Sequence, residues 1–169
     1  RRGVELPSIA IGGGQEGGRR AGTEAVHQIV GMGVAARLAA DLTPMEQISK
    51  LRDRLEGELL SRVGNAFRNG AAGQRLPNTA NISFAETNGE AILALLDEAG
   101  ICVSTGSACN SETQEASAVL RAMEIPYSRA MGSIRFSLGR FNTENEVERV
   151  IAATIDAVER LRKLAGVAA

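Results

Sequence analysis

The chain has 169 residues, a formal net charge of −1 and 44% hydrophobic residues, with no Trp and one Tyr. This length suffices for one domain with a genuine core, which must rest on aliphatic side chains. The near-neutral charge gives no reason to expect nucleic acid or an anionic membrane as a partner. Two cysteines and one histidine provide neither a zinc-type ligand set nor a disulfide scaffold. With no apolar run long enough to cross a membrane and no secretory signal, we expect a cytoplasmic protein.

Apolar periodicity and capping signals predict the helices. The first runs from Thr23 to about Ala40, and five of its apolar side chains are expected to pack: Val26, Ile29, Val30, Val34 and Leu38. Capping boxes, in which a hydroxyl and a carboxylate bind free backbone amides, predict three more helix starts, at 43–46, 87–90 and 143–146. Gly100 is expected to end the second of these three helices. A fifth helix is predicted over residues 115–123.

Alternation of polar and apolar residues predicts strands over 81–84 and 133–138. A brief apolar run over 101–103 is interpreted as a third strand, with Cys102 in the core. Residues 68–77 are rich in Gly and polar side chains, which indicates a loop or hairpin. Helices and strands thus alternate through most of the chain. This order predicts an α/β fold in which helices pack on a small sheet.

Cys109 lies in a stretch of small and polar residues, 104–111, directly after the third predicted strand. Structural cysteines usually lie among apolar side chains, where they behave as small hydrophobic residues. The neighbours of Cys109 instead favour a loop that solvent can reach. Because an accessible thiol can ionise and act as a nucleophile, we interpret Cys109 as a functional residue. An incidental surface cysteine is the alternative.

A glycine-rich segment, residues 12–24, precedes the first helix and contains Arg19, Arg20 and Thr23. Glycines allow a ligand to approach the backbone closely, and Thr23 is expected at a helix start, whose free amides attract anions. Binding of a phosphate or a carboxylate is one interpretation. A flexible surface loop with Thr23 as the helix cap is the other, since the pattern matches neither a Walker loop nor a dinucleotide fingerprint.

Arg135 lies within the predicted strand 133–138, between Ile134 and Phe136. Because side chains alternate along a strand, Arg135 is expected on the face opposite these two apolar residues. A guanidinium on a rigid strand can bind a carboxylate through two hydrogen bonds. From the spacing alone, a surface salt bridge with one of the many glutamates is the preferred interpretation.

Three motifs together resemble the C-terminal part of cysteine desulfurases of the NifS/IscS type, in the class-V aminotransferase family. They are Gly-Gly-Gln-Glu…Arg-Arg-Ala-Gly-Thr-Glu (13–24), Ser-Thr-Gly-Ser-Ala-Cys (104–109) and Gly-Ser-Ile-Arg-Phe-Ser-Leu-Gly-Arg (132–140). They occur in the family's order and spacing, and the similarity spans nearly the whole chain. The resemblance implies the C-terminal small domain of a transferase that depends on pyridoxal 5′-phosphate (PLP). Such enzymes are homodimers of fold type I, the aspartate-aminotransferase fold.

The resemblance also implies an activity for the full-length protein: L-cysteine is converted to L-alanine, and a persulfide forms on Cys109. Arg135 would grip the substrate α-carboxylate, which reverses the preference for a salt bridge. Thr23 would bind the phosphate of PLP in the partner subunit. An Fe–S scaffold protein would accept the sulfur, for nitrogen fixation or for general cluster assembly. Cys109 would then be able to share a cluster metal ion briefly with that scaffold.

The sequence opens at Arg1 without Met, and the family's Schiff-base Lys and two further cofactor-binding residues, an Asp and a His, lie upstream. We therefore expect residues 1–40 to end the large domain, residues 41–169 to form the small domain, and this chain alone to be inactive. Glu112 and Ala116 stand where the family has Gly and Pro after Cys109. A selenocysteine lyase, or a PLP-independent module that accepts sulfur or binds a partner, is the alternative function.

Overall fold

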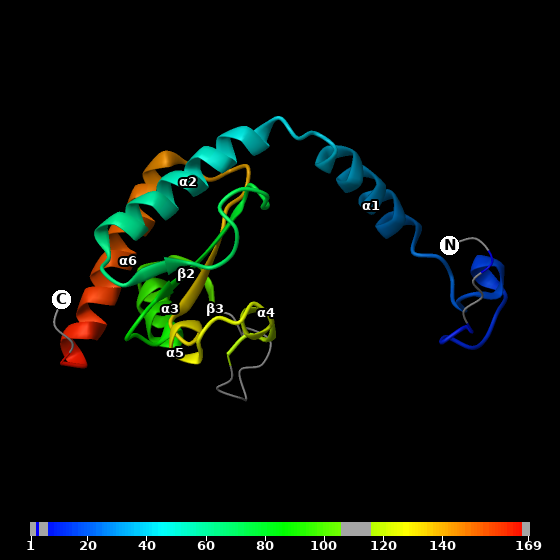
Figure 1. Ribbon diagram of the computed structural model, residues 1–169. Coiled ribbons are helices and arrows are strands. Elements are labelled where there is room, and N and C mark those ends of the chain that lie inside the picture. The colour runs from blue at the N-terminus through cyan, green and yellow to red at the C-terminus, as the bar shows by residue number, and fades with distance from the viewer. Residues whose placement is uncertain (1–2, 4–6, 106–115, 167–169) are drawn as a thin grey trace. The chain divides into compact units, whose positions relative to one another are not determined.

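A computed structural model describes residues 3, 7–105 and 116–166 of the protein (Figure 1). The chain divides into two compact units, residues 1–42 and 43–169, and each is described by itself. In the described part of the chain, no helix combines the length and the apolar character that crossing a membrane requires.

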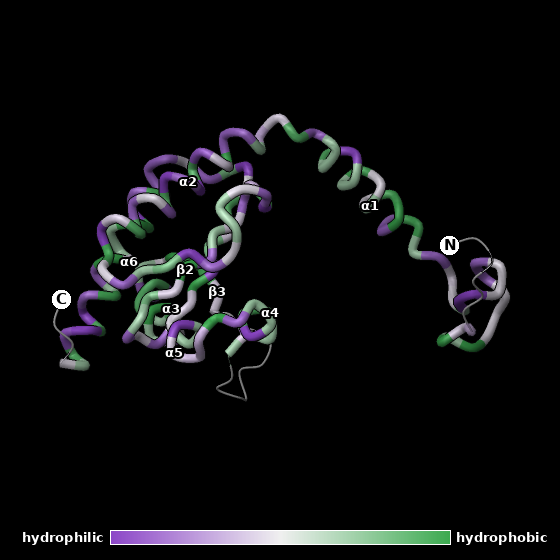
Figure 2. Tube along the Cα trace, in the orientation of Figure 1, coloured by the Kyte–Doolittle hydropathy of each residue, from purple (hydrophilic) through white to green (hydrophobic). Residues whose placement is uncertain are grey.

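The first unit contains a short 3-10 helix, η1 (Gln15–Gly18), and the helix α1 (Val26–Ala39). α1 starts three residues later than predicted, and its N-cap residue, Ala25, makes no side-chain cap hydrogen bond. The expected packing of its five apolar residues is wrong, because they are 39–64% exposed. Hydrophobic and small residues occur all along α1 (Figure 2). A helix that lacks a polar face is typical of one that a larger protein buries.

The second unit has three long helices, and apolar periodicity predicted each of them. They are α2 (Pro44–Arg62), α3 (Gly89–Glu98) and α6 (Glu144–Leu164). Two short helices, α4 (Ala118–Ala122) and α5 (Tyr127–Ala130), follow one another between the third and fourth strands. α4 is shorter than the predicted helix over 115–123, whose first residue lies outside the described residues.

The three predicted capping boxes have different outcomes. At Thr143, the backbone N–H donates to Glu146 Oε2 at 2.8 Å and the hydroxyl accepts from Glu146 N at 3.3 Å, so this box is confirmed. The other two are wrong, since Thr43 makes no side-chain cap hydrogen bond and Asn88 caps α3. Thr87 is unavailable as a cap because its hydroxyl donates to the Phe84 carbonyl at 2.6 Å. Gly100 follows α3 with φ +71°, as expected of a helix end.

Four strands form one antiparallel sheet in the order β1-β2-β4-β3. They are β1 (Ala66–Arg68), β2 (Thr79–Phe84), β3 (Ser104–Thr105) and β4 (Ser133–Ser137). The predicted loop lies between β1 and β2 and joins them as a hairpin. β1 itself was not predicted. The α/β class with helices on a small sheet is confirmed.

The strand predicted over 101–103 is wrong, because pairing with β4 is found only at residues 104 and 105. Cys102 is exposed, and it lines a cavity of about 340 Å³ beside β4 and α6. Its predicted position in the core is therefore also wrong. The buried side chain in this run is Ile101, which is 8% exposed.

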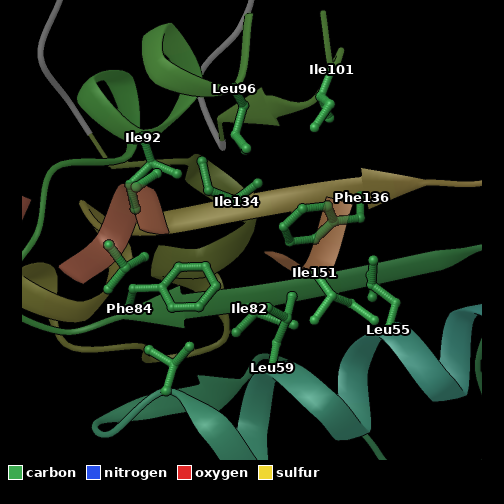
Figure 3. Close-up of a cluster of buried hydrophobic side chains, with 14 of the residues drawn as sticks. Leu55, Leu59, Ile82, Phe84, Ile92, Leu96, Ile101, Ile134, Phe136 and Ile151 are labelled. Carbon is green, nitrogen blue, oxygen red and sulfur yellow. The ribbon is translucent and has the colours of Figure 1, made fainter. Parts of the chain in front are cut away.

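Side chains of β2 and β4 alternate between two different faces of the sheet. Ile82, Phe84, Ile134 and Phe136 share one face and are at most 3% exposed. Helices α2, α3 and α6 cover this face and complete the core with aliphatic side chains that include Leu55, Leu59, Ile92, Leu96 and Ile151 (Figure 3). The opposite face carries polar side chains: Thr79, Asn81, Ser83, Ser133, Arg135 and Ser137.

A buried ion cluster ties the hairpin to α2. Glu56 of α2 is 3% exposed and accepts from Arg68 Nε at 2.6 Å and from Arg75 Nη1 at 2.5 Å. Burial by itself would raise the pKa of Glu56. Hydrogen bonds and charge from Arg75 and Arg68 outweigh burial, so the pKa lies below its ordinary value of 4.5. The carboxylate therefore stabilises the fold in its charged form.

We expect Glu56→Gln to lower the free energy of unfolding at neutral pH by about 3 kcal/mol, because it removes the charge that two guanidinium groups share. Urea unfolding followed by circular dichroism measures this. The folded-state pKa of Glu56 is lowered, so its stabilisation is present above the ordinary pKa and is lost as pH falls through the folded-state pKa. The difference between parent and variant should shrink over that range. Glu46→Gln, in the exposed pair with Lys50, is the matched control and should change little.

The exposure of Cys102 predicts fast labelling by a thiol reagent. In this chain with Cys109→Ser, the remaining thiol should react with dithionitrobenzoate at a rate close to that of the urea-unfolded chain. A thiol in the core would react only after unfolding, roughly 10³-fold or more slower. Strong protection of Cys102 would contradict the described position of this residue.

Candidate functional site

Arg135 is the predicted site residue whose surroundings the structure describes most fully. It lies in the middle of β4 and is exposed, while Ile134 and Phe136 on the opposite face are buried. This confirms its predicted orientation. None of the ion pairs found among the described residues includes Arg135. The surface salt bridge that spacing alone favoured is therefore not formed in this part of the chain.

Two polar residues lie directly opposite Arg135 in the sheet, Asn81 on β2 and Ser104 on β3. Leu138 N donates to Asn78 O and Phe84 N donates to Gly132 O, on the two flanks of β4. The even-numbered residues between them therefore bond to β2. Arg135 and Asn81 therefore form a non-hydrogen-bonded pair, in which opposing Cα atoms are only about 4.5 Å apart. The backbone of Arg135 points toward β3 instead, at Ser104.

A buried network of amides and hydroxyls lies beside Arg135 on the same face. Asn69 Nδ2 donates to Asn81 Oδ1 at 2.7 Å, to Ser83 Oγ at 2.7 Å and to Ser133 Oγ at 3.2 Å. The hydroxyls of Ser83 and Ser133 are 2.8 Å apart, and these two residues are 0% and 1% exposed. Buried polar groups are costly unless they are hydrogen-bonded, so this network holds β2, β4 and the start of the hairpin loop in one arrangement.

Gly132, directly before β4, explains how the chain comes so close to the end of β2. A Cβ at this position would collide with the carbonyl oxygen of Phe84, and Thr87 Oγ1 is also close, at 3.0 Å. Phe84 N in turn donates to Gly132 O at 2.9 Å. Glycine in the Gly-Ser-Ile-Arg motif therefore permits the register that places Arg135 beside Asn81.

The glycine-rich segment belongs to the first unit and does not adopt the predicted helix start. Thr23 is exposed and lies three residues before α1, so the placement of its side chain at the helix N-terminus is wrong. The segment folds back on itself, since Gly22 N donates to Gln15 Oε1 at 3.2 Å and Gly22 has φ +100°. Arg19 and Arg20 are exposed. The segment thus presents a hydroxyl and two cationic side chains to solvent, and its binding of an anion stays a prediction.

Cys109 lies outside the described residues. β3, the last described element before it, ends at Thr105, four residues upstream. No group of three or more His, Cys, Asp or Glu side chains in the described ranges is arranged to hold a metal ion.

The residues present fit only part of a PLP site. A Schiff base needs a lysine amine, and the chain has two lysines, Lys50 and Lys163. They lie on α2 and α6, which cover the face of the sheet opposite Arg135, and Lys50 is paired with Glu46 at 2.7 Å. Thr23, Arg19 and Arg20 are exposed and offer a hydroxyl and positive charge, which are groups of the types that bind a phosphate.

Sequence reasoning missed Asn81 and Ser104 as neighbours of Arg135. The alternation in 81–84 does place Asn81 on the face opposite Ile82. Arg135 was likewise expected on the polar face of its own strand. That signal identifies a polar face on each strand. It does not identify which residues of two strands stand opposite one another.

Comparison with known proteins shows the family. Residues 9–150 match the class-V aminotransferase family. The chain is 51% identical over 166 residues to a cysteine desulfurase of Gluconacetobacter diazotrophicus. This match covers 97% of this chain and 42% of that protein. It is 49% identical to the cysteine desulfurase NifS of Azotobacter vinelandii, and the match covers 97% of this chain and 41% of that protein. The chain thus spans about two fifths of the length of these relatives.

Solved structures of NifS-like proteins also match this chain. A NifS-like protein matches with a TM-score of 0.83 at 34% identity, covering 95% of this chain and 41% of that chain. A NifS-like protein from Rickettsia africae matches with a TM-score of 0.79 at 34% identity, covering 92% and 41%. Since the family match extends over most of the chain, and sequence and fold agree with it, the chain belongs to the class-V aminotransferase family and resembles NifS-like cysteine desulfurases over part of their length.

Proposed function

We propose that the protein to which this chain belongs is a PLP-dependent cysteine desulfurase, which converts L-cysteine to L-alanine and keeps the sulfur as a persulfide on Cys109. One observation carries the proposal. Ser104 of β3 pairs with Arg135 of β4, so the strand that leads to Cys109 is joined to the strand that carries the carboxylate-binding guanidinium. The similarity to cysteine desulfurases over 97% of the chain supports it.

The residues of this chain take three roles in the proposal. Arg135 binds the α-carboxylate of L-cysteine and so orients the substrate. Thr23 binds the phosphate of PLP in the partner subunit of a homodimer. Bound PLP would supply the electron sink that allows the substrate to lose its α-proton. Residues 1–40 then belong to the end of a large domain that holds the cofactor, and residues 41–169 form a small domain of fold type I.

Cys109 performs the sulfur transfer. Its thiolate attacks the sulfur of L-cysteine, an S–S bond forms, and the Cβ–S bond of the substrate breaks. The electron pair of the broken bond stays with the substrate carbon, which takes up a proton, and L-alanine leaves. The products are L-alanine and an enzyme persulfide, so atoms and electrons balance without an added oxidant.

The acceptor of the persulfide sulfur is, in this proposal, an Fe–S scaffold protein. Nitrogen fixation and general cluster assembly are the two uses that this sulfur would have. Cys109 would also be able to bind a cluster iron while the scaffold is docked, because a thiolate is a ligand that Fe–S clusters use.

Intact-mass spectrometry of the full-length protein tests the proposal. With PLP and L-cysteine, we expect one added sulfur atom on the parent and on Cys102→Ser, and none on Cys109→Ser. Cys102→Ser is the matched control because Cys102 is the other cysteine of the chain and is exposed. Holoenzyme that releases L-alanine with no sulfur on Cys109 would refute the role of this residue. Turnover of L-selenocysteine alone would identify a selenocysteine lyase instead.

Arg135→Ala is expected to raise the KM for L-cysteine roughly 10- to 100-fold, because a hydrogen-bonded contact to a charged group is worth about 1.5–3 kcal/mol. Steady-state alanine formation measures this. Arg135→Lys should recover only part of the loss, since an ammonium group cannot reproduce the bidentate geometry. An unchanged KM in both variants would remove Arg135 from the substrate site.

A further inference from the structure

The sheet face around Arg135 carries a second hydrogen-bond donor, the side-chain amide of Asn81. The two residues stand directly opposite each other in the β2–β4 pairing, at a position where opposing Cα atoms are about 4.5 Å apart. Side chains of such a pair share one face and lie within reach of the same small group. Asn81 is half-buried, and Arg135 is exposed.

Asn69 determines which way the amide of Asn81 is turned. Its Nδ2 donates to Asn81 Oδ1 at 2.7 Å, and it also donates to Ser83 Oγ at 2.7 Å. Asn69 is 9% exposed and Ser83 is 0% exposed, so the orientation is held from inside the protein. With its oxygen engaged by Asn69, Asn81 offers the remaining polar group, the Nδ2 donor, to its surroundings.

Two donor groups therefore belong to residues that stand opposite each other on one face of the sheet. The guanidinium of Arg135 has five N–H donors and no acceptor, and the NH₂ group of Asn81 also only donates. Neither can bind the other. A carboxylate satisfies both, because its two oxygens offer about four acceptor sites, enough for a bidentate arginine and one amide.

We propose that Asn81 is a second binding residue for the carboxylate that Arg135 holds, and that it donates from Nδ2. This inference rests on the proposed function, in which the carboxylate is that of an amino-acid substrate. Asn81 then favours amino acids over the corresponding amines, which lack this group. The buried network keeps the donor in place before the substrate arrives, so binding loses little side-chain freedom.

Calorimetric titration of the full-length holoenzyme with L-alanine and with ethylamine tests this role. Ethylamine is L-alanine without its carboxylate. We expect Asn81→Ala to weaken L-alanine binding about tenfold and to leave ethylamine binding unchanged. Asn69→Ala is the matched control. It removes the same Asn69–Asn81 hydrogen bond from the other end but keeps the Asn81 amide as a donor that is no longer held in one orientation, so the loss of L-alanine affinity should be smaller than in Asn81→Ala, and ethylamine binding should again be unchanged.

The outcomes separate this inference from the proposed function. A loss of ethylamine affinity in Asn81→Ala equal to its loss of L-alanine affinity would show that Asn81 acts only through the fold and would overturn the inference. A loss of L-alanine affinity in Arg135→Ala, with none in Asn81→Ala, would overturn it too while keeping the proposed function. No loss in Arg135→Ala would instead overturn the carboxylate site itself. Asn81→Val, a good strand former, replaces Asn81→Ala if the latter does not fold.

Discussion

Where β2 pairs with β4, Ile82 stands opposite Ile134 and Asn81 stands opposite Arg135. A shift of this register by one residue would turn Arg135 toward the core and Ile134 toward the polar face, because strand side chains alternate. The helices that cover the apolar face oppose such a shift. Ile82 and Ile134 are 0% exposed, and full burial of such a side chain is worth about 1.5–3 kcal/mol. The packing of the core therefore also determines where the candidate site lies.

Hydrogen bonds and an ion pair, in place of apolar packing, hold the polar face of the sheet. At the start of the hairpin loop, Asn69 connects β2 and β4 through buried hydroxyls. Near the end of the loop, Arg75 is paired with Glu56, and Arg52 donates to the carbonyl of Leu76 at 2.8 Å. Both ends of the loop are thus fixed by groups that would be costly to bury alone. This arrangement keeps the Asn81 amide in a single orientation beside Arg135.

Features that depend on local spacing were predictable from the sequence. The face of Arg135 follows from strand alternation, and the Thr143 capping box follows from a four-residue pattern. The role of Asn81 depends on a register between strands far apart in the chain, which no local pattern encodes. Apolar neighbours predicted burial of Cys102. Pairing with β4 begins only at residue 104, however, and this thiol stays exposed. The accessibility of Cys109 stays a prediction.

Under the proposed function, β4 carries the residue that recognises the substrate, and β3 leads to the residue that transfers the sulfur. Arg135 lies on β4, which pairs with β2 on one side and with β3 on the other, so the strand is held from both sides. Such support suits a group that must hold a carboxylate in one geometry. β3 pairs over two residues at the edge of the sheet, and the chain runs on from Thr105 toward Cys109. A thiol that takes sulfur from a substrate and gives it to another protein has to reach two places, which a residue inside a paired strand cannot do. The edge strand β3 ends four residues before Cys109, which suits a thiol with this task.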